Sequence, residues 1–134
     1  MMTTQIADLV RRWFRQADSG SLMLPDGWFG GRAGESMFTL VDVQASGDML
    51  VVYMSQDGTL ILDHPRRAYV DAEADLVFED FDEATFRWKP FGHKKCDDYR
   101  YSSGQVRLVA PLRMSMPAQG DLPRAKPDKG SEAG

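Results

Sequence analysis

The sequence is poor in cysteine, in basic charge and in long apolar runs. Its single cysteine, Cys96, excludes an intramolecular disulfide bond and a zinc site built from several cysteines. Lys and Arg total 16 against 20 Asp and Glu, a net charge of −4, which argues against a general nucleic-acid binder because phosphate contacts need a basic surface. The longest apolar run is Met49–Met54, far shorter than the roughly 20 residues of a membrane span. We therefore expect no nucleic-acid and no membrane partner.

The N-terminus lacks the features of a signal peptide. Asp8, Arg11 and Arg12 interrupt its apolar positions, and no long apolar stretch follows a basic start. A lone unpaired cysteine is typical of a reducing compartment. We expect a cytoplasmic protein, and a chain of 134 residues with 43% apolar residues fits one globular domain.

Residues 4–18 have the period of an amphipathic helix. Apolar residues recur at helical spacing along one stripe: Ile6, Leu9, Val10, Trp13 and Phe14. Thr3 or Thr4 suits the N-cap, and Gly20 suits the position after the C-cap. We expect this helix to cover a sheet of its own chain; the alternative is a helix that binds a partner or a membrane surface.

After Gly20 the period changes from 3.6 to 2, and short β-rich runs alternate with turn signals. The expected strands are Leu22–Leu24, Met37–Val43, Met49–Met54, Thr59–Leu62, Ala68–Asp71, Leu76–Phe78, Thr85–Lys89 and Gln105–Ala110. Asp57-Gly58 predicts a tight hairpin in which both residues adopt positive φ. Ser46–Asp48 and Ser103-Gly104 predict two further turns. No second helical stripe follows, so antiparallel pairing is favoured over βαβ units.

These elements predict an α+β fold in a single domain, residues 1–116. The amphipathic helix packs on a curled antiparallel sheet, either a meander or a partly open barrel, of about six to eight strands. Residues 117–134 form a predicted disordered tail, because three prolines and one large apolar residue, Leu122, cannot offset the entropy cost of ordering it.

The most unusual stretch is Leu24-Pro25-Asp26-Gly27-Trp28-Phe29-Gly30-Gly31-Arg32. With the later Phe81, Phe86-Arg87-Trp88, Phe91-Gly92 and Tyr101–Arg107 segments, it resembles a family of small, functionally uncharacterised bacterial proteins marked by an L-P-D-G-W-F-G-R segment. The resemblance spans roughly residues 20–110 and differs in Gly31, which separates the glycine from Arg32. It implies kinship and no activity or cofactor.

Trp28 and Phe29 have two interpretations. Large aromatic side chains beside glycines most often fill a core, where the glycines let backbone pass close by. Alternatively, Trp28, Phe29 and Arg32 form a shallow aromatic site for an anionic or planar ligand.

Motifs for nucleotide binding or nucleophilic catalysis are missing: the sequence contains no G-x-S-x-G, no P-loop and no dinucleotide-binding glycine pattern. His93 and Cys96 have a chelating spacing, but two lysines separate them and structural zinc takes four ligands. We therefore expect no metal site, no cofactor and no catalytic set.

Seven acidic residues and no basic one lie between Asp71 and Glu83. Such a run is most often a solvated edge that blocks strand aggregation. It can also bind a cation, dock a partner, or supply an acid/base pair. Glu79, Asp80 and Asp82, with His93, are the candidate binding residues of this region.

Composition and motifs favour a small non-catalytic binding or protein-interaction module. One alternative is a small-molecule binding protein whose curled sheet holds an apolar cavity. The other is an enzyme in which Glu79, Asp80 or Asp82 acts with His93 or His64. The oligomeric state is left open by the sequence.

Overall fold

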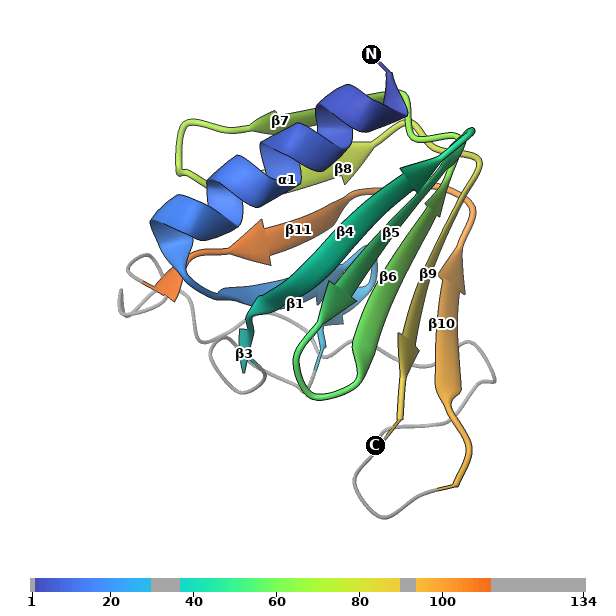
Figure 1. Cartoon of the computed structure of the whole chain (residues 1–134). Helices are drawn as coiled ribbons and strands as arrows, with labels where there is room; N and C mark the ends of the chain where they lie inside the picture. The colour runs from blue at the N-terminus through green and yellow to red at the C-terminus, as the bar shows by residue number, and fades with distance from the viewer. Residues whose placement is uncertain (1, 30–36, 90–93, 112–134) are drawn as a thin grey trace.

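The computed structural model describes residues 2–29, 37–89 and 94–111, which form one helix and two antiparallel sheets (Figure 1). The helix α1 spans Thr3–Ala17. The first sheet has the order β2-β1-β11-β8-β7, with β3 also paired to β1. Its strands are β1 (Gly20–Leu24), β2 (Gly27–Trp28), β3 (Met37–Phe38), β7 (Arg67–Val70), β8 (Leu76–Glu79) and β11 (Val106–Val109).

The second sheet has the order β10-β9-β6-β5-β4. Its strands are β4 (Leu40–Ser46), β5 (Met49–Met54), β6 (Gly58–Asp63), β9 (Glu83–Trp88) and β10 (Asp97–Tyr101). Every strand pair within the described residues is antiparallel. The α+β class and the antiparallel pairing are therefore confirmed.

The predicted curling of one sheet is wrong, because the strands divide into two separate sheets. Residues 64–66 carry the chain from β6 to β7, and residues 80–82 carry it back from β8 to β9. His64 and Asp80 have positive φ values of 51° and 60°, a conformation outside the β region. Each of these residues interrupts an extended segment, and the chain on its two sides joins different sheets.

The helix contacts both sheets. It packs against β4 and β5 of the second sheet and against β7 of the first (Figure 1). Its buried residues are Ile6, Ala7, Val10, Trp13 and Phe14. The expectation that the apolar stripe covers a sheet of its own chain is confirmed, and in fact it covers an edge of both.

Both predicted caps of this helix differ from the observed ones. The helix begins at Thr3, and the Gln5 side chain accepts a hydrogen bond from the backbone N–H of Met2. It ends at Ala17, and the C-cap residue Asp18 has a φ of 67° and donates its N–H to the carbonyl of Phe14. Gly20 instead lies in β1, where an added Cβ would be 2.8 Å from Cη2 of Trp13, so the position needs glycine for close packing.

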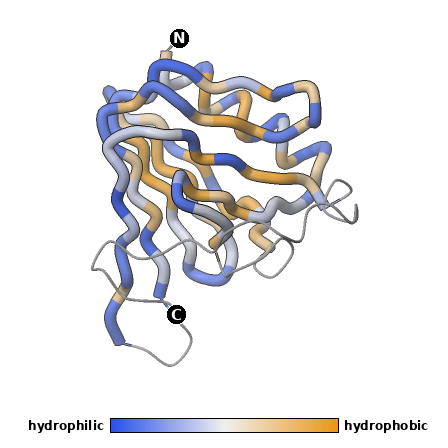
Figure 2. The backbone as a smooth tube through the Cα atoms, turned by 180° about the vertical axis from the view of Figure 1, so that it is seen from behind, coloured by the Kyte–Doolittle hydropathy of each residue, from blue (hydrophilic) through white to orange (hydrophobic). Residues whose placement is uncertain are grey.

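Aromatic side chains fill the space between the sheets. Phe29 contacts Phe86, Trp88 and Tyr99 edge to face, at centroid distances of 4.9 to 5.3 Å. Figure 2 shows hydrophobic residues mainly along the strands and hydrophilic residues at many of the turns. Phe29 thus packs closely against the second sheet, and the apolar cavity of the alternative function stays a prediction.

The hairpin between β5 and β6 forms as predicted, but its turn is one residue earlier. Gln56 and Asp57 have the positive φ values, 61° and 59°. Gly58 belongs to β6, where an added Cβ would be 2.8 Å from Cε1 of Phe38 and 3.1 Å from Cζ of Phe86. Glycine is therefore needed at position 58 because aromatic rings pack closely against it, and not because the turn requires it. The predicted disordered tail, residues 117–134, lies outside the described residues.

Candidate functional site

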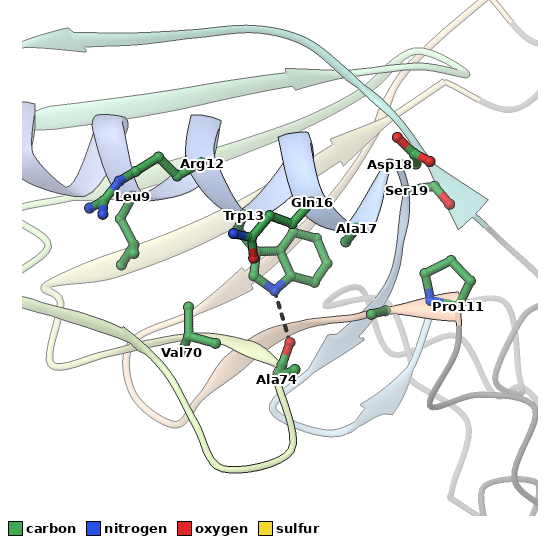
Figure 3. Close-up of a pocket in the computed structure, with 11 residues that line it drawn as sticks. Leu9, Arg12, Trp13, Gln16, Ala17, Asp18, Ser19, Val70, Ala74 and Pro111 are labelled. Carbon is green, nitrogen blue, oxygen red and sulfur yellow. Dashed lines mark hydrogen bonds between the residues drawn. The ribbon is translucent and has the colours of Figure 1, made fainter.

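An open groove of about 720 Å³ lies between the C-terminal half of α1, the turn after β7 and the end of β11 (Figure 3). We call it the α1–β7 groove. Its apolar lining consists of Leu9, Trp13, Ala17, Val70, Ala74, Ala110 and Pro111, and its polar lining of Arg12, Gln16, Asp18 and Ser19. The groove thus combines an apolar surface with polar and charged groups.

Trp13 is held rigidly in the wall of the groove. Its indole Nε1–H donates a 2.9 Å hydrogen bond to the carbonyl of Ala74, and its ring packs edge to face on Phe14 at 5.0 Å. Gly20 allows the far edge of the indole to lie against β1. Across the groove, Val70 leaves 43% of its surface exposed, so apolar area is available to a ligand.

Opposite charges mark the two ends of the groove. Figure 3 shows Arg12 beside Leu9 at one end and Asp18 near Pro111 at the other. Arg12 is exposed and forms no ion pair with any acidic residue of the described segments, whereas the neighbouring Arg11 pairs with Asp8 at 2.8 Å. The groove therefore offers a cation to an anionic group of a ligand.

The turn after β7 is locked by a network around Arg107. The Asp71 carboxylate accepts hydrogen bonds from the backbone N–H groups of Glu73 and Asp75, each at 3.0 Å. Arg107 pairs with Asp71 at 2.7 Å and with the fully buried Asp75 at 3.3 Å. Ala74 has a φ of 68° within this turn. The network therefore positions the Ala74 carbonyl that binds Trp13.

The charges of this network reinforce each other. Burial alone would raise the pKa of Asp71, but hydrogen bonds from the Asp75 backbone and from Arg107 outweigh it and lower that pKa below its ordinary value. Burial alone would lower the pKa of Arg107, but its hydrogen bond to Asp71 and the nearby carboxylates raise it. Asp71 and Arg107 are therefore both charged at neutral pH.

The structure places the predicted aromatic residues in the core. Trp28 is fully buried and Phe29 is 4% exposed. The Trp28 Nε1 atom has no hydrogen-bond partner among the described residues. Arg32 and His93 lie outside the described residues.

The predicted acidic residues divide between two places. Glu79 accepts hydrogen bonds from Tyr69 and Gln105, at 3.1 and 2.7 Å, and pairs with Arg67 at 3.1 Å. It belongs to the first sheet. Asp80 and Asp82 lie in the link from β8 to β9, so the structure does not bring all three carboxylates together.

Asp80 and Asp82 are part of a charged cluster at the corner between the sheets. Asp82 pairs with Arg66 and with His64, whose Nδ1 is 3.3 Å from Asp82 Oδ2. Arg66 also lies 3.7 Å from Asp80. A hydrogen bond to Asp63, helped by the charges of Asp48 and Asp82, raises the pKa of His64. We call this group the corner cluster.

The α1–β7 groove and most of the corner cluster were not predicted from the sequence. The helical stripe already placed Leu9 and Trp13 on one face, but no local signal linked them to Val70, Ala74 or Pro111. Asp63 directly precedes His64 in the sequence, but no local signal placed Asp48 beside this pair. These sets form only when distant segments come together.

No helix in the described part of the chain combines the length and apolar character needed to cross a bilayer. Comparison of the chain with protein-family models, with curated proteins and with solved structures finds no match. The resemblance to the family with the L-P-D-G-W-F-G segment therefore stays a prediction.

Proposed function

We propose that the protein is a non-catalytic interaction module whose α1–β7 groove binds an apolar peptide segment of a partner protein, with a carboxylate of that segment near Arg12. The observation that carries this proposal is the exposed Arg12, which has no ion-pair partner among the described residues, at the end of an apolar groove whose wall is a hydrogen-bonded tryptophan. Binding surfaces are enriched in Trp and Arg, which contribute much of the affinity.

A volume of about 720 Å³ also falls within the range of small-ligand pockets, about 300–1,000 Å³. Two features favour a peptide. The groove is open and not enclosed, and its charges are at opposite ends, where Figure 3 shows Arg12 and Asp18. A short peptide can span the groove, cover its apolar wall and pair with both ends.

Charge complementarity also favours a partner over the residues that follow Pro111. The sequence after Pro111 begins Leu-Arg-Met-Ser-Met-Pro and contains no acidic residue before Asp121. Its apolar residues come first, and its first carboxylate, Asp121, follows ten residues after Pro111. A segment of a partner protein that combines apolar and acidic residues satisfies both requirements.

The test is selection of a random hexapeptide phage library on the immobilised full chain. We expect wild-type protein to enrich peptides with aliphatic or aromatic residues next to Asp or Glu. Arg12→Glu should enrich Lys or Arg at the same place, since the groove cation becomes an anion. For a selected peptide, anisotropy should show affinity two- to fivefold lower for Arg12→Glu, about the size of an exposed ion pair.

Arg15→Glu is the matched control, because Arg15 is an exposed cation on the same helix that does not line the groove. It should keep the wild-type peptide preference. Failure to enrich any peptide, or the same preference in wild type and Arg12→Glu, contradicts the proposal. A mass that doubles with protein concentration in light scattering, and falls on Val70→Asp, would show that a second copy of the chain covers the groove.

A further inference from the structure

The corner cluster lies where the chain passes twice between the sheets. The link from β6 to β7 and the link from β8 to β9 run side by side and share backbone hydrogen bonds, from Asp82 N to Asp63 O and from Arg66 N to Asp80 O, both 2.9 Å. His64 N also donates to Asp48 O at 2.7 Å. The backbone thus brings residues of three turns to one point.

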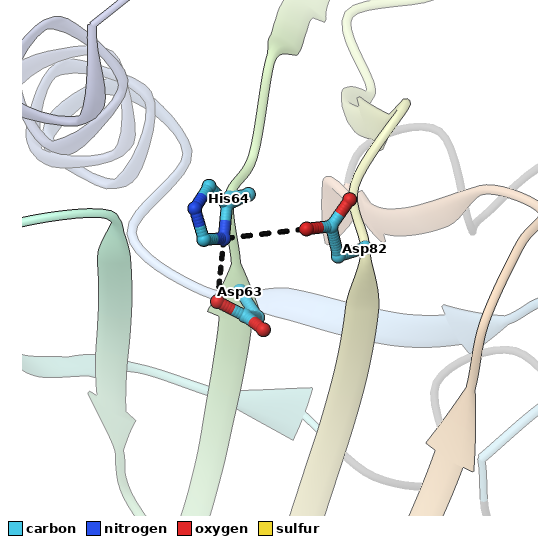
Figure 4. A group of neighbouring side chains, drawn as sticks. All are labelled: Asp63, His64 and Asp82. Carbon is cyan, nitrogen blue, oxygen red and sulfur yellow. Dashed lines mark hydrogen bonds and ion pairs between the residues drawn. The ribbon is translucent and has the colours of Figure 1, made fainter.

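Both nitrogens of the His64 ring face carboxylates. Nδ1 is 2.9 Å from Oδ1 of Asp63 and 3.3 Å from Oδ2 of Asp82 (Figure 4). Nε2 is 3.1 Å from Oδ2 of Asp48. A neutral imidazole carries one N–H, so it can donate to only one side. When Nε2–H of the neutral ring donates to Asp48, the Nδ1 lone pair faces carboxylate oxygens, and either a proton on Nδ1 or a metal ion fills that position.

The spacing on the Nδ1 side suits a metal ion. One ligand atom from each of Asp63, His64 and Asp82 lies within 4.8 Å of the other two. Zinc binds imidazole nitrogen and carboxylate oxygen at about 2.0–2.2 Å, which places neighbouring ligand atoms about 3.0–3.5 Å apart. The 3.3 Å separation of Nδ1 from Asp82 falls in this range, and the 2.9 Å separation from Asp63 is just below it.

Asp48 occupies the position of a supporting carboxylate. A histidine that binds metal through one nitrogen commonly donates its other N–H to a carboxylate, which fixes the ring and its tautomer. With Nε2–H donating across the 3.1 Å contact to Asp48, Nδ1 of the neutral ring is the metal ligand and faces Asp63 and Asp82.

The charges of the cluster also suit a divalent ion. Asp48, Asp63 and Asp82 contribute three negative charges, and Arg66 neutralises one by pairing with Oδ1 of Asp82. Asp82 keeps Oδ2 for the metal, and the more distant Asp80 shares Arg66 at 3.7 Å. An imidazole ligand favours zinc over calcium or magnesium, which prefer oxygen ligands.

We infer that Nδ1 of His64, together with one carboxylate oxygen each from Asp63 and Asp82, binds a zinc ion, with Asp48 orienting the imidazole. The ion joins the two links that connect the sheets. This site is independent of the α1–β7 groove, so either inference can fail without the other.

Equilibrium dialysis of the full chain against micromolar ZnCl₂, followed by elemental analysis, tests this inference. We expect one bound zinc per chain, a higher Tm with zinc, and an X-ray absorption spectrum with one imidazole in a shell of nitrogen and oxygen ligands. His64→Asn should abolish stoichiometric binding; asparagine tolerates the left-handed backbone of position 64. Asp48→Asn should weaken binding by about 10- to 100-fold.

Two control variants separate this site from other zinc ligands. Glu73→Gln removes a carboxylate of the acidic group near Arg107, and Cys96→Ser removes the only thiol; both should keep one bound zinc. Asp82→Asn is a second variant at the site, with folding checked by circular dichroism. Zinc that does not bind, or that binds equally to folded His64→Asn and Asp82→Asn, overturns the inference.

Discussion

Replacing Arg107 by leucine is expected to lower the free energy of unfolding by about 3–5 kcal/mol at pH 7, because removing one partner of a buried ion pair leaves the other charge uncompensated. Arg107 is 24% exposed in its side chain and pairs with Asp75, whose side chain is fully buried. Urea unfolding followed by circular dichroism measures the loss. The turn that holds the Ala74 carbonyl should loosen as well, since Arg107 also binds Asp71.

Arg100→Leu is the control for this prediction. Arg100 pairs with Asp98 at 3.2 Å, but its side chain is 56% exposed, and exposed ion pairs contribute about 0–1 kcal/mol. A loss in Arg107→Leu no larger than that in Arg100→Leu would show that the network around Asp71 and Asp75 does not stabilise the fold.

The pH dependence gives a second readout of the same network. The pKa of Asp71 is lower in the folded than in the unfolded chain, so its stabilising contribution is complete above the unfolded value of about 3.9. This contribution is lost as the pH falls through the folded pKa. Stability of the wild type should therefore decrease below about pH 4, and the difference from Arg107→Leu should shrink there.

Trp13→Ala is expected to lower the free energy of unfolding by about 3–5 kcal/mol, the usual cost of truncating a buried tryptophan. Trp13 is only 6% exposed and loses its packing on Phe14 and its hydrogen bond to Ala74. Trp13→Phe, which removes the hydrogen bond but keeps a ring, should cost about 1–2 kcal/mol. Thermal and urea unfolding of the three proteins give the ranking.

A double-mutant cycle with Gly20 isolates the contact between α1 and β1. Gly20→Ala alone places a Cβ 2.8 Å from Cη2 of Trp13 and should cost about 1–3 kcal/mol. In the Trp13→Ala background that atom is absent, so the same substitution should cost much less. Equal costs in the two backgrounds would mean that the indole does not lie against Gly20.

The elements that the sequence predicted most accurately are those whose apolar residues recur with a regular period. The helix expected over residues 4–18 is Thr3–Ala17, and Met49–Met54 matches β5 in both bounds. Both segments repeat their apolar residues in a pattern set by the backbone itself. By contrast, β10 was missed because Asp97 and Asp98 mask its strand character; Asp98 pairs across the sheet with Arg87 at 2.9 Å.

Local sequence patterns could not predict the division into two sheets, nor the positions of the α1–β7 groove and the corner cluster. The sheets separate at His64 and Asp80, neither of them a glycine, yet both with positive φ. His and Asp are among the residue types that adopt positive φ more often than others, but aspartate recurs throughout the chain, so residue type alone does not locate the break. The groove joins residues of α1 to Val70, Ala74 and Pro111, and such contacts follow only from the packing of the helix across both sheet edges.

The most direct test of the proposed function is a ¹⁵N NMR titration of the full chain with a peptide selected from the library. The three tryptophans give three indole N–H signals. Trp13 lines the groove, whereas Trp28 is buried in the core and Trp88 lies on β9. The indole signal of Trp13 should shift saturably while those of Trp28 and Trp88 stay in place; a bound peptide that leaves the Trp13 signal unchanged would contradict the assignment of the groove.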